Sequence, residues 1–122
     1  PAERAALNAI THPRIRELAL RRTAELAETG APVALYDAPL LIENRLHEGM
    51  DGVILVWCPR EVQRARLMAR DGLSEAQAEA RLASQLPIDA KRPYATWLID
   101  NSGALEATQT QVERVAAKLR GQ

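Results

Sequence analysis

The sequence predicts an α/β fold in which helices cover a parallel sheet. Short apolar runs alternate with longer segments of helical periodicity, an order typical of strands joined by crossover helices. The run GVILVW at residues 52–57 is apolar throughout, as expected for a strand that is covered on both faces. Of the 122 residues, 47% are hydrophobic and only 3% are aromatic, so aliphatic side chains must form the core of one domain.

The first part of the chain is predicted to be helical. Residues 3–29 have helical periodicity and are expected to form a helix in one piece or two. Thr11 can cap the second piece, with Pro13 in its first turn, where a missing N–H costs little. Gly30 is placed to end the helix, and residues 33–36 (VALY) follow as the first predicted strand.

The middle of the chain adds a second strand and a second helical region. Residues 40–49 (LLIENRLHEG) are expected to form a short helical loop before the strand at 52–57. A helix is predicted over residues 58–70, because the proline near its start suits a first helical position. The Asp-Gly pair at 71–72 should end this helix.

The last part contains a further helix, the third strand and a final helix. Ser74 and Gln77 have the spacing of a capping box, so a helix should run from there to about Leu86. Residues 96–100 (TWLID) are the third predicted strand, and an amphipathic helix is expected from Gly103 onward. All three strands are predicted to be parallel, because helices separate them.

Composition and charge argue against several classes of function. Sixteen basic residues balance sixteen acidic ones, whereas a general nucleic-acid surface needs a basic excess. No apolar run approaches the roughly 20 residues of a membrane span, and no signal peptide is visible. The single cysteine, Cys58, cannot form an intrachain disulfide and is expected to be a buried small residue or an N-cap. We therefore expect a cytoplasmic protein without nucleic-acid or membrane partners.

Two carboxylates follow predicted strands. Asp37 and Asp100 each stand at a carboxyl end, the edge where open parallel sheets bind ligands. Asp37 could bind a metal ion, directly or through water, or accept a proton. It could equally form a turn or cap the following loop, and its position alone does not decide between these interpretations.

A group of arginines occupies the two helices that meet at residues 71–72. Arg66 and Arg70 are four residues apart and so share a helix face, and Arg81 and Gln85 repeat that spacing on the next helix. Together they could present several guanidinium groups to one pocket, a chemistry that suits phosphate oxygens. Taken alone, the residues favour the alternative of a solvated hairpin with Glu–Arg pairs.

Two weaker patterns also suggest anion or nucleotide binding. His12, with Arg14 and Arg16 nearby, stands near a helix start that could bind an anion, although a capped helix with surface charges is the favoured interpretation. Residues 100–103 (DNSG) form a polar turn after a strand, which is consistent with a nucleotide-contacting loop.

Five stretches in this order resemble the dephospho-coenzyme A (dephospho-CoA) kinase family across nearly the whole chain. They are LNAITHPRIR, DAPLLIE, VILVWCPREVQ, RLMARDGLSEAQAEARLASQLP and LIDNSG. Members of this family transfer the γ-phosphoryl group of ATP to the ribose 3′-hydroxyl of dephospho-CoA. The resemblance implies a three-layer P-loop kinase-type parallel sheet with a helical lid, and ATP and Mg²⁺ as cofactors.

The resemblance implies roles for the residues on the acceptor side. Asp37, followed by Pro39 and Leu40, matches an acidic motif at a strand end near the Mg²⁺ ion and the transferred phosphoryl group. Asp37 would then act in catalysis and hold Mg²⁺ through water, while Pro39 and Leu40 would contact the substrate. His12 and Arg16 match a helical segment that binds the substrate.

The nucleotide side is matched by a lid and a loop. The lid pattern is matched by Arg66, Arg70, Asp71, Arg81 and Gln85. Within it, Arg70 would contact the ATP phosphates and act in catalysis, with Arg66 and Arg81 also binding the nucleotide. Asn101 and Gly103 match the loop near the adenine of ATP, and Lys91 matches a recurrent basic position between lid and core.

The resemblance also divides the chain and shows what it lacks. It implies a helical substrate region at 1–32, a core part at 33–65, the lid at 66–92 and a core strand and helix at 93–122. The family's Gly-x-x-x-x-Gly-Lys-[Ser/Thr] loop, with the strand before it, has no match in this sequence. We therefore expect the C-terminal two-thirds of a dephospho-CoA kinase, inactive and poorly folded without its N-terminal segment.

Two alternatives stay open at this point. The chain could be a non-catalytic remnant or binding module that keeps the outer parts of the P-loop kinase fold. It could also belong to another small-molecule kinase of the same superfamily.

Overall fold

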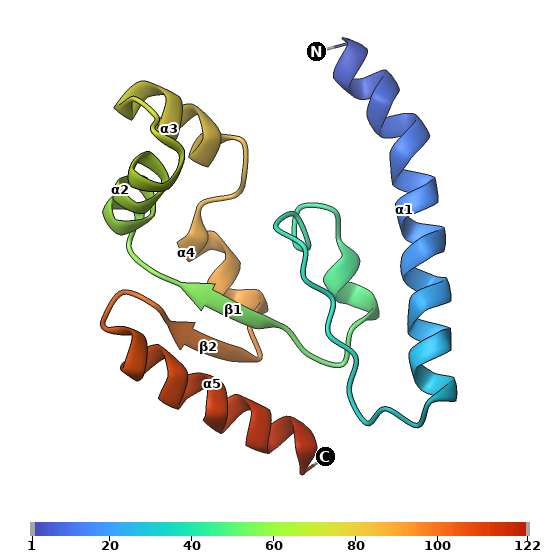
Figure 1. Ribbon diagram of the computed structural model, residues 1–122. Coiled ribbons are helices and arrows are strands. Elements are labelled where there is room, and N and C mark those ends of the chain that lie inside the picture. The colour runs from blue at the N-terminus through green and yellow to red at the C-terminus, as the bar shows by residue number, and fades with distance from the viewer. Residues whose placement is uncertain (1, 122) are drawn as a thin grey trace. The chain divides into compact units, whose positions relative to one another are not determined.

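The computed structural model describes residues 2–121, which fall into two compact units that divide between residues 36 and 37. The first unit contains one helix, α1 (Ala2–Glu28), and an extended segment. The second unit contains, in order, η1 (Leu46–Gly49), β1 (Ile54–Trp57), α2 (Arg60–Asp71), α3 (Glu75–Ala83), α4 (Ile88–Lys91), η2 (Arg92–Tyr94), β2 (Trp97–Asp100) and α5 (Leu105–Arg120) (Figure 1). The predicted α/β class is confirmed in the second unit, where helices accompany a parallel sheet.

Helix α1 is one uninterrupted helix, so the prediction of a second piece capped by Thr11 is wrong. Pro13 lies inside the helix, and the hydroxyl of Thr11 donates a hydrogen bond back to the carbonyl of Leu7, 3.0 Å away. A proline inside a helix removes one backbone hydrogen bond and crowds the carbonyl four residues earlier, and α1 carries this cost at Pro13 without being interrupted. Gly30, with a φ of +72°, follows the helix and accepts the left-handed geometry that ends it.

Residues 33–36 are extended but do not form a strand, so the prediction of a first strand there is wrong. No backbone hydrogen bond joins any of these four residues to another segment of residues 2–121. An extended segment becomes a strand only when its N–H and C=O groups pair with a neighbour. Leu35 is 74% exposed, so its apolar side chain is not part of a core in this structure.

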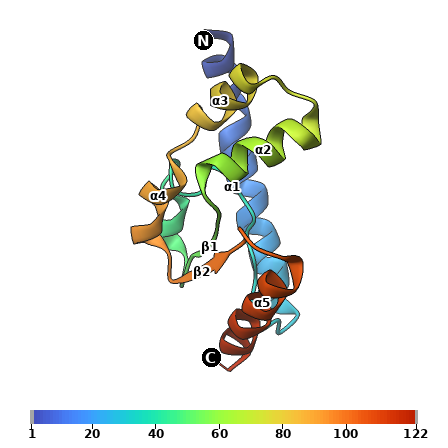
Figure 2. The same cartoon turned by 90° about the vertical axis from the view of Figure 1, so that its left-hand side faces the viewer.

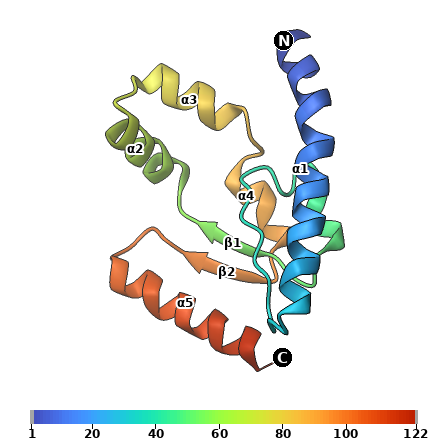
Figure 3. The same ribbon diagram turned by 45° about the vertical axis from the view of Figure 1, so that its right-hand side comes forward.

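The sheet of the second unit has two parallel strands, which Figure 3 shows side by side with α5 next to β2. Both strands are shorter than predicted by one or two residues at their amino ends. Trp57 and Asp100 are register partners, so both strands end at the same edge. Gln111 of α5 fixes this end of β2, because its side-chain amide donates to the carbonyl of Asp100 and accepts from its N–H, both at 2.9 Å. The buried core residues are Ile42, Val53, Leu55, Ala78, Ile99 and Val115.

Helices α2 and α3 form a helical hairpin whose turn agrees with the sequence prediction (Figure 2). Gly72 ends α2 with a φ of +63°, a conformation that glycine adopts without the strain of a Cβ atom. Ser74 then caps α3 in a capping box, in which the Ser74 hydroxyl and the Gln77 amide each bind the other's backbone N–H. Helix α3 ends at Ala83 instead of continuing to Leu86. Cys58, expected to be a buried small residue or an N-cap, is only half-buried, and Pro59 caps α2 without a side-chain bond.

Replacing Ser74 by alanine is expected to lower the free energy of unfolding by about 1 kcal/mol, because the first turn of α3 loses its hydroxyl acceptor. Urea denaturation followed by circular dichroism measures the change. Thr110→Ala is the matched control, since within residues 2–121 that hydroxyl bonds only to the Glu106 carbonyl of the same helix. Equal stability of the two variants would show that the capping box does not contribute.

Candidate functional site

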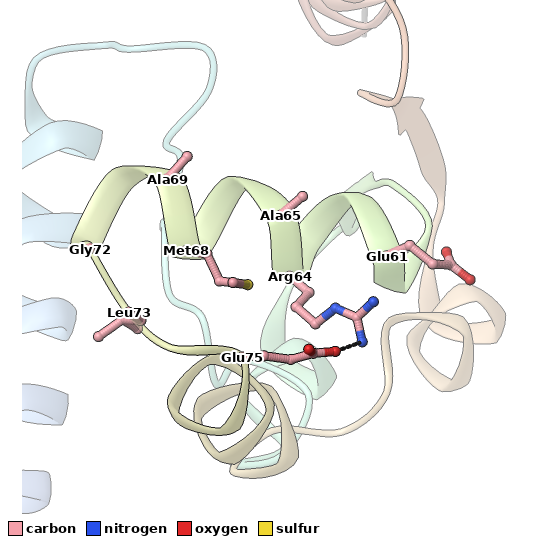
Figure 4. Close-up of a pocket in the computed structure, with 8 residues that line it drawn as sticks. All are labelled: Glu61, Arg64, Ala65, Met68, Ala69, Gly72, Leu73 and Glu75. Carbon is pink, nitrogen blue, oxygen red and sulfur yellow. Dashed lines mark ion pairs between the residues drawn. The ribbon is translucent and has the colours of Figure 1, made fainter.

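The helical hairpin carries a groove on each of two faces. One groove, called the arginine groove below, is lined by Gln63, Arg66, Leu67, Arg70, Arg81, Leu82 and Gln85. The second groove, shown in Figure 4, is lined by Glu61, Arg64, Ala65, Met68, Ala69, Gly72, Leu73 and Glu75. Helix α2 contributes to both, because residues three or four apart lie on one face and the intervening residues lie on another.

The arginine groove unites residues that the sequence pattern predicted to share a pocket. Arg66 and Arg70 come from α2, whereas Arg81 comes from α3 and Gln85 from the turn that follows α3. No acidic side chain lines this groove among the described residues. Its three guanidinium groups and two carboxamides therefore offer hydrogen-bond donors to an anion.

The opposite groove has its positive charge neutralised. Arg64 lies 2.9 Å from Glu75, an ion pair drawn in Figure 4, and 3.3 Å from Glu79. Glu79 also accepts a 2.6 Å hydrogen bond from Arg60, and these arginine contacts, with that from Arg60 the largest, lower the pKa of its carboxyl group. The alternative of a hairpin with Glu–Arg pairs thus describes this groove, and the arginine groove is the candidate anion site.

Asp71 joins the two helices at the arginine groove. Its carboxylate accepts two hydrogen bonds from Arg70, at 2.7 Å and 3.1 Å, and another from Arg81. The hydrogen bond from Arg70, and to a lesser degree the contact with Arg81, lowers the pKa of the Asp71 carboxyl group. The same hydrogen bond raises the pKa of Arg70, so the contact favours the ionised form of both Arg70 and Asp71.

Arg66 connects the hairpin to the turn after β2. Its guanidinium donates a 2.6 Å hydrogen bond to the backbone carbonyl of Asn101, and the side-chain carbonyl of Asn101 accepts from Thr108 at 3.0 Å. Asp100 accepts two bonds from Ser102, which lower the pKa of its carboxyl group. The turn at 100–103, which includes Gly103, is thus ordered by local bonds and contacted by Arg66 of α2.

Lys91 is the only buried charged residue in the described part of the chain, with 7% exposure. Its Nζ lies 2.9 Å from the carboxylate of Glu43 and donates to the carbonyl of Pro39 at 3.2 Å. Sequence reasoning named Lys91 and Pro39 but did not connect them. The ion pair brings the segment that contains Pro39 and Leu40 against α4, about 50 residues later in the chain.

A second cluster at the end of β1 was missed by sequence reasoning. The indole N–H of Trp57 donates a 2.8 Å hydrogen bond to Asp89 of α4, and the guanidinium of Arg92 lies 5.1 Å from the Trp57 ring centroid. Arg92 and Asp89 lie 3.7 Å apart. Nothing in the local sequence pairs Trp57 with Asp89 or Arg92, because both are more than thirty positions away from it.

The remaining predicted residues belong to segments outside the helical hairpin. Asp37 is exposed, and within residues 2–121 no hydrogen bond or ion pair involves its carboxylate. His12 and Arg16 are exposed residues of α1 in the first unit, which is described by itself. Among the described residues there is no group of three or more His, Cys, Asp or Glu side chains that could hold a metal ion, and no helix is long and apolar enough to cross a membrane.

Comparison with known proteins connects this geometry to one family. A family model described as dephospho-CoA kinase matches residues 1–107. A dephospho-CoA kinase of Anaeromyxobacter dehalogenans is 50% identical over 121 residues, which are 99% of this chain and 57% of the relative. One from Geobacter sulfurreducens is 48% identical over 112 residues, or 92% of this chain and 57% of the relative.

Two solved structures have the same fold. A crystal structure of a Thermus thermophilus protein superposes with a TM-score of 0.78 at 38% identity, over 93% of this chain and 58% of that one. A dephospho-CoA kinase from Campylobacter jejuni gives a TM-score of 0.66 at 30% identity, over 97% of this chain and 59% of that one. The chain therefore spans a little over half the length of the relatives and structures that it matches.

Proposed function

Because the chain belongs to the dephospho-CoA kinase family, we propose that it forms part of an enzyme that phosphorylates dephospho-CoA. The full-length protein transfers the γ-phosphoryl group of ATP to the ribose 3′-hydroxyl of dephospho-CoA, the last step of coenzyme A biosynthesis. The arginine groove is the observation that carries this proposal. It offers three guanidinium groups from two helices to a single anionic ligand.

The hairpin acts as a lid over the ATP phosphates. Arg70 is the residue that contacts the transferred phosphoryl group, since its side chain is 73% exposed at the groove and its guanidinium is held only by Asp71 within the described residues. Arg66 and Arg81 supply further positive charge from the same groove. Guanidinium groups match the geometry and charge of phosphate oxygens, so a preorganised set stabilises the charge of the transition state.

The turn after β2 contacts the nucleotide base. Asn101 and Gly103 belong to this turn, which follows the carboxyl end of a parallel strand, where ligands bind in open α/β sheets. The bond from Arg66 to the Asn101 carbonyl supports the proposal, because it couples the lid to this turn. The bond thereby connects the arginines proposed to bind the phosphates with the turn proposed to bind the base of the same nucleotide.

Asp37 is proposed to hold Mg²⁺, through water, and to act in catalysis. Its exposed carboxylate lacks a protein partner within residues 2–121, so it is free to bind a hard cation. Mg²⁺ is usually bound through one or two carboxylates together with waters and substrate phosphates, so a single carboxylate from this chain fits. When bound, the ion would neutralise charge on the phosphates.

The acceptor substrate is proposed to contact two segments. Pro39 and Leu40 follow Asp37, and the bond from Lys91 to the Pro39 carbonyl fixes this segment against α4. Arg16 of α1 provides a positive charge, and His12 a titratable imidazole, for the phosphates of the substrate. In this proposal residues 1–32 form the substrate region, 33–65 and 93–122 belong to the core, and 66–92 form the lid.

The phosphate loop is supplied by a segment of the full-length protein outside these residues. The sequence contains no Gly-x-x-x-x-Gly-Lys-[Ser/Thr] loop to bind the β- and γ-phosphates. Residues 1–122 alone are therefore proposed to lack phosphoryl transfer and to bind ATP weakly. The full-length enzyme acts in the cytoplasm.

The proposal is tested by incubating the full-length protein with ATP, Mg²⁺ and dephospho-CoA and detecting coenzyme A by mass spectrometry. Formation of coenzyme A with equimolar ADP is the expected result. Turnover only with a different acceptor would assign another small-molecule kinase. Nucleotide binding without any turnover would instead assign a non-catalytic member of the fold.

Asp37→Asn is expected to lower turnover of the full-length enzyme while the protein stays folded. The substitution removes the negative charge that Mg²⁺ requires but keeps the shape of the side chain. Steady-state rates measured over a range of Mg²⁺ concentrations, with circular dichroism as a check on folding, give the result. Full activity at limiting Mg²⁺ would assign Asp37 to a turn and remove it from the site. Asp51→Asn, at another exposed carboxylate, is the matched control.

A further inference from the structure

Asp71 binds two of the three arginines that line the arginine groove, as an anionic ligand would. The two oxygens of its carboxylate accept a bidentate pair of bonds from Arg70, and one of them also accepts from Arg81. A phosphate group binds guanidinium groups with the same forked geometry. The carboxylate therefore uses the donors that a bound phosphate would require.

The contacts of Asp71 are weak enough to exchange. The side chains of Arg70 and Arg81 are 73% and 57% exposed, and that of Asp71 is 24% exposed. Water screens ion pairs between exposed groups, so even this bidentate pair with the added bond from Arg81 shifts an equilibrium by only about tenfold or less. In the described residues neither guanidinium has another side-chain partner, so release from Asp71 frees both for a ligand.

We propose that Asp71 is an internal competitor for the phosphates of the nucleotide, which pairs with Arg70 and Arg81 in the free lid and is displaced when ATP binds. This inference rests on the function proposed above and adds one residue, Asp71, that lowers the affinity for ATP. The arginine contacts also lower the pKa of Asp71, which favours its ionised form. An interaction present only in the free state opposes binding by the amount of its free energy.

Asp71→Asn is therefore expected to tighten ATP binding. The full-length protein should bind ATP about threefold to tenfold more tightly in isothermal titration calorimetry at constant ionic strength, the range that corresponds to the loss of one or two exposed ion pairs. Asp71→Ser is the second variant, because its hydroxyl is too short to bridge both guanidinium groups. This variant should also bind ATP more tightly than wild type.

Glu79→Gln is the matched control. It removes one negative charge from the same hairpin, but its partners Arg60 and Arg64 belong to the opposite face. Its ATP affinity should stay within about twofold of wild type, well below a tenfold step. An equal gain in this control would assign the effect to net charge and overturn the role of Asp71.

The outcomes separate this inference from the proposed function. If wild type binds ATP and neither Asp71 variant binds it more tightly, Asp71 stays on the arginines in the complex and the competitor role is wrong, while the kinase assignment stands. If wild type binds no ATP and forms no coenzyme A, the proposed function fails and this inference fails with it.

Discussion

Arg70→Ala in the full-length enzyme is expected to lower kcat at least about a hundredfold. One preorganised donor that stabilises transition-state charge is typically worth about a hundredfold to a thousandfold in rate. Arg70 has the position for this role, because it lines the arginine groove and its guanidinium is exposed there. Initial rates at saturating ATP and dephospho-CoA measure the loss.

Arg64→Ala is the matched control for Arg70→Ala. Arg64 lies on the same helix, but on the face where Glu75 and Glu79 neutralise it. Its kcat should stay close to that of wild type. A kcat of Arg70→Ala within about threefold of wild type would mean that the arginine groove does not act on the transferred phosphoryl group.

Lys91→Met is expected to lower the free energy of unfolding of the full-length protein by about 3 kcal/mol. The substitution removes the cation from a buried pair and leaves the carboxylate of Glu43 without its partner. An uncompensated charge in a poorly hydrated position is costly, and the Pro39 carbonyl loses its donor as well. Urea denaturation measures the change.

A double substitution separates the lost pair from lost packing. Lys91→Met combined with Glu43→Leu replaces both charges with apolar groups, and it should recover part of the stability lost in the single variant. Lys118→Met changes an exposed lysine on α5 and should alter the free energy of unfolding by less than about 0.5 kcal/mol. Equal stability of the Lys91 and Lys118 variants would contradict a buried ion pair.

Local signals predicted most of the second unit correctly. Gly72 and the Ser74–Gln77 capping box determine the hairpin turn through their own backbone geometry, so the sequence suffices to locate it. The apolar run of β1 and its separation by helices from β2 predicted parallel pairing, which the register confirms. Residues 33–36 gave an equally apolar signal but form no strand, because strand formation depends on a neighbour that local sequence does not specify.

The candidate site was predictable only where helical periodicity brings residues together. Spacings of four placed Arg66 with Arg70 and Arg81 with Gln85, and the turn between the helices brought both pairs to one groove. The pairing of Lys91 with Glu43 was not predictable in this way, because a long-range contact has no periodicity. The residues around Pro13 misled in the opposite way. They give a strong local signal for the start of a helix, yet Pro13 lies inside one continuous helix.

The contacts of Trp57 give the protein a built-in fluorophore at the base of the hairpin. The chain has two tryptophans, Trp57 and Trp97, so a Trp97→Phe variant would leave Trp57 as the single indole emitter of these residues. A carboxylate of α4 accepts from the indole N–H and a guanidinium of η2 lies over the ring, so the surroundings of this indole change when α4 or η2 moves relative to β1. Rearrangement of the hairpin's attachment to the sheet thus becomes an optical signal that needs no attached dye.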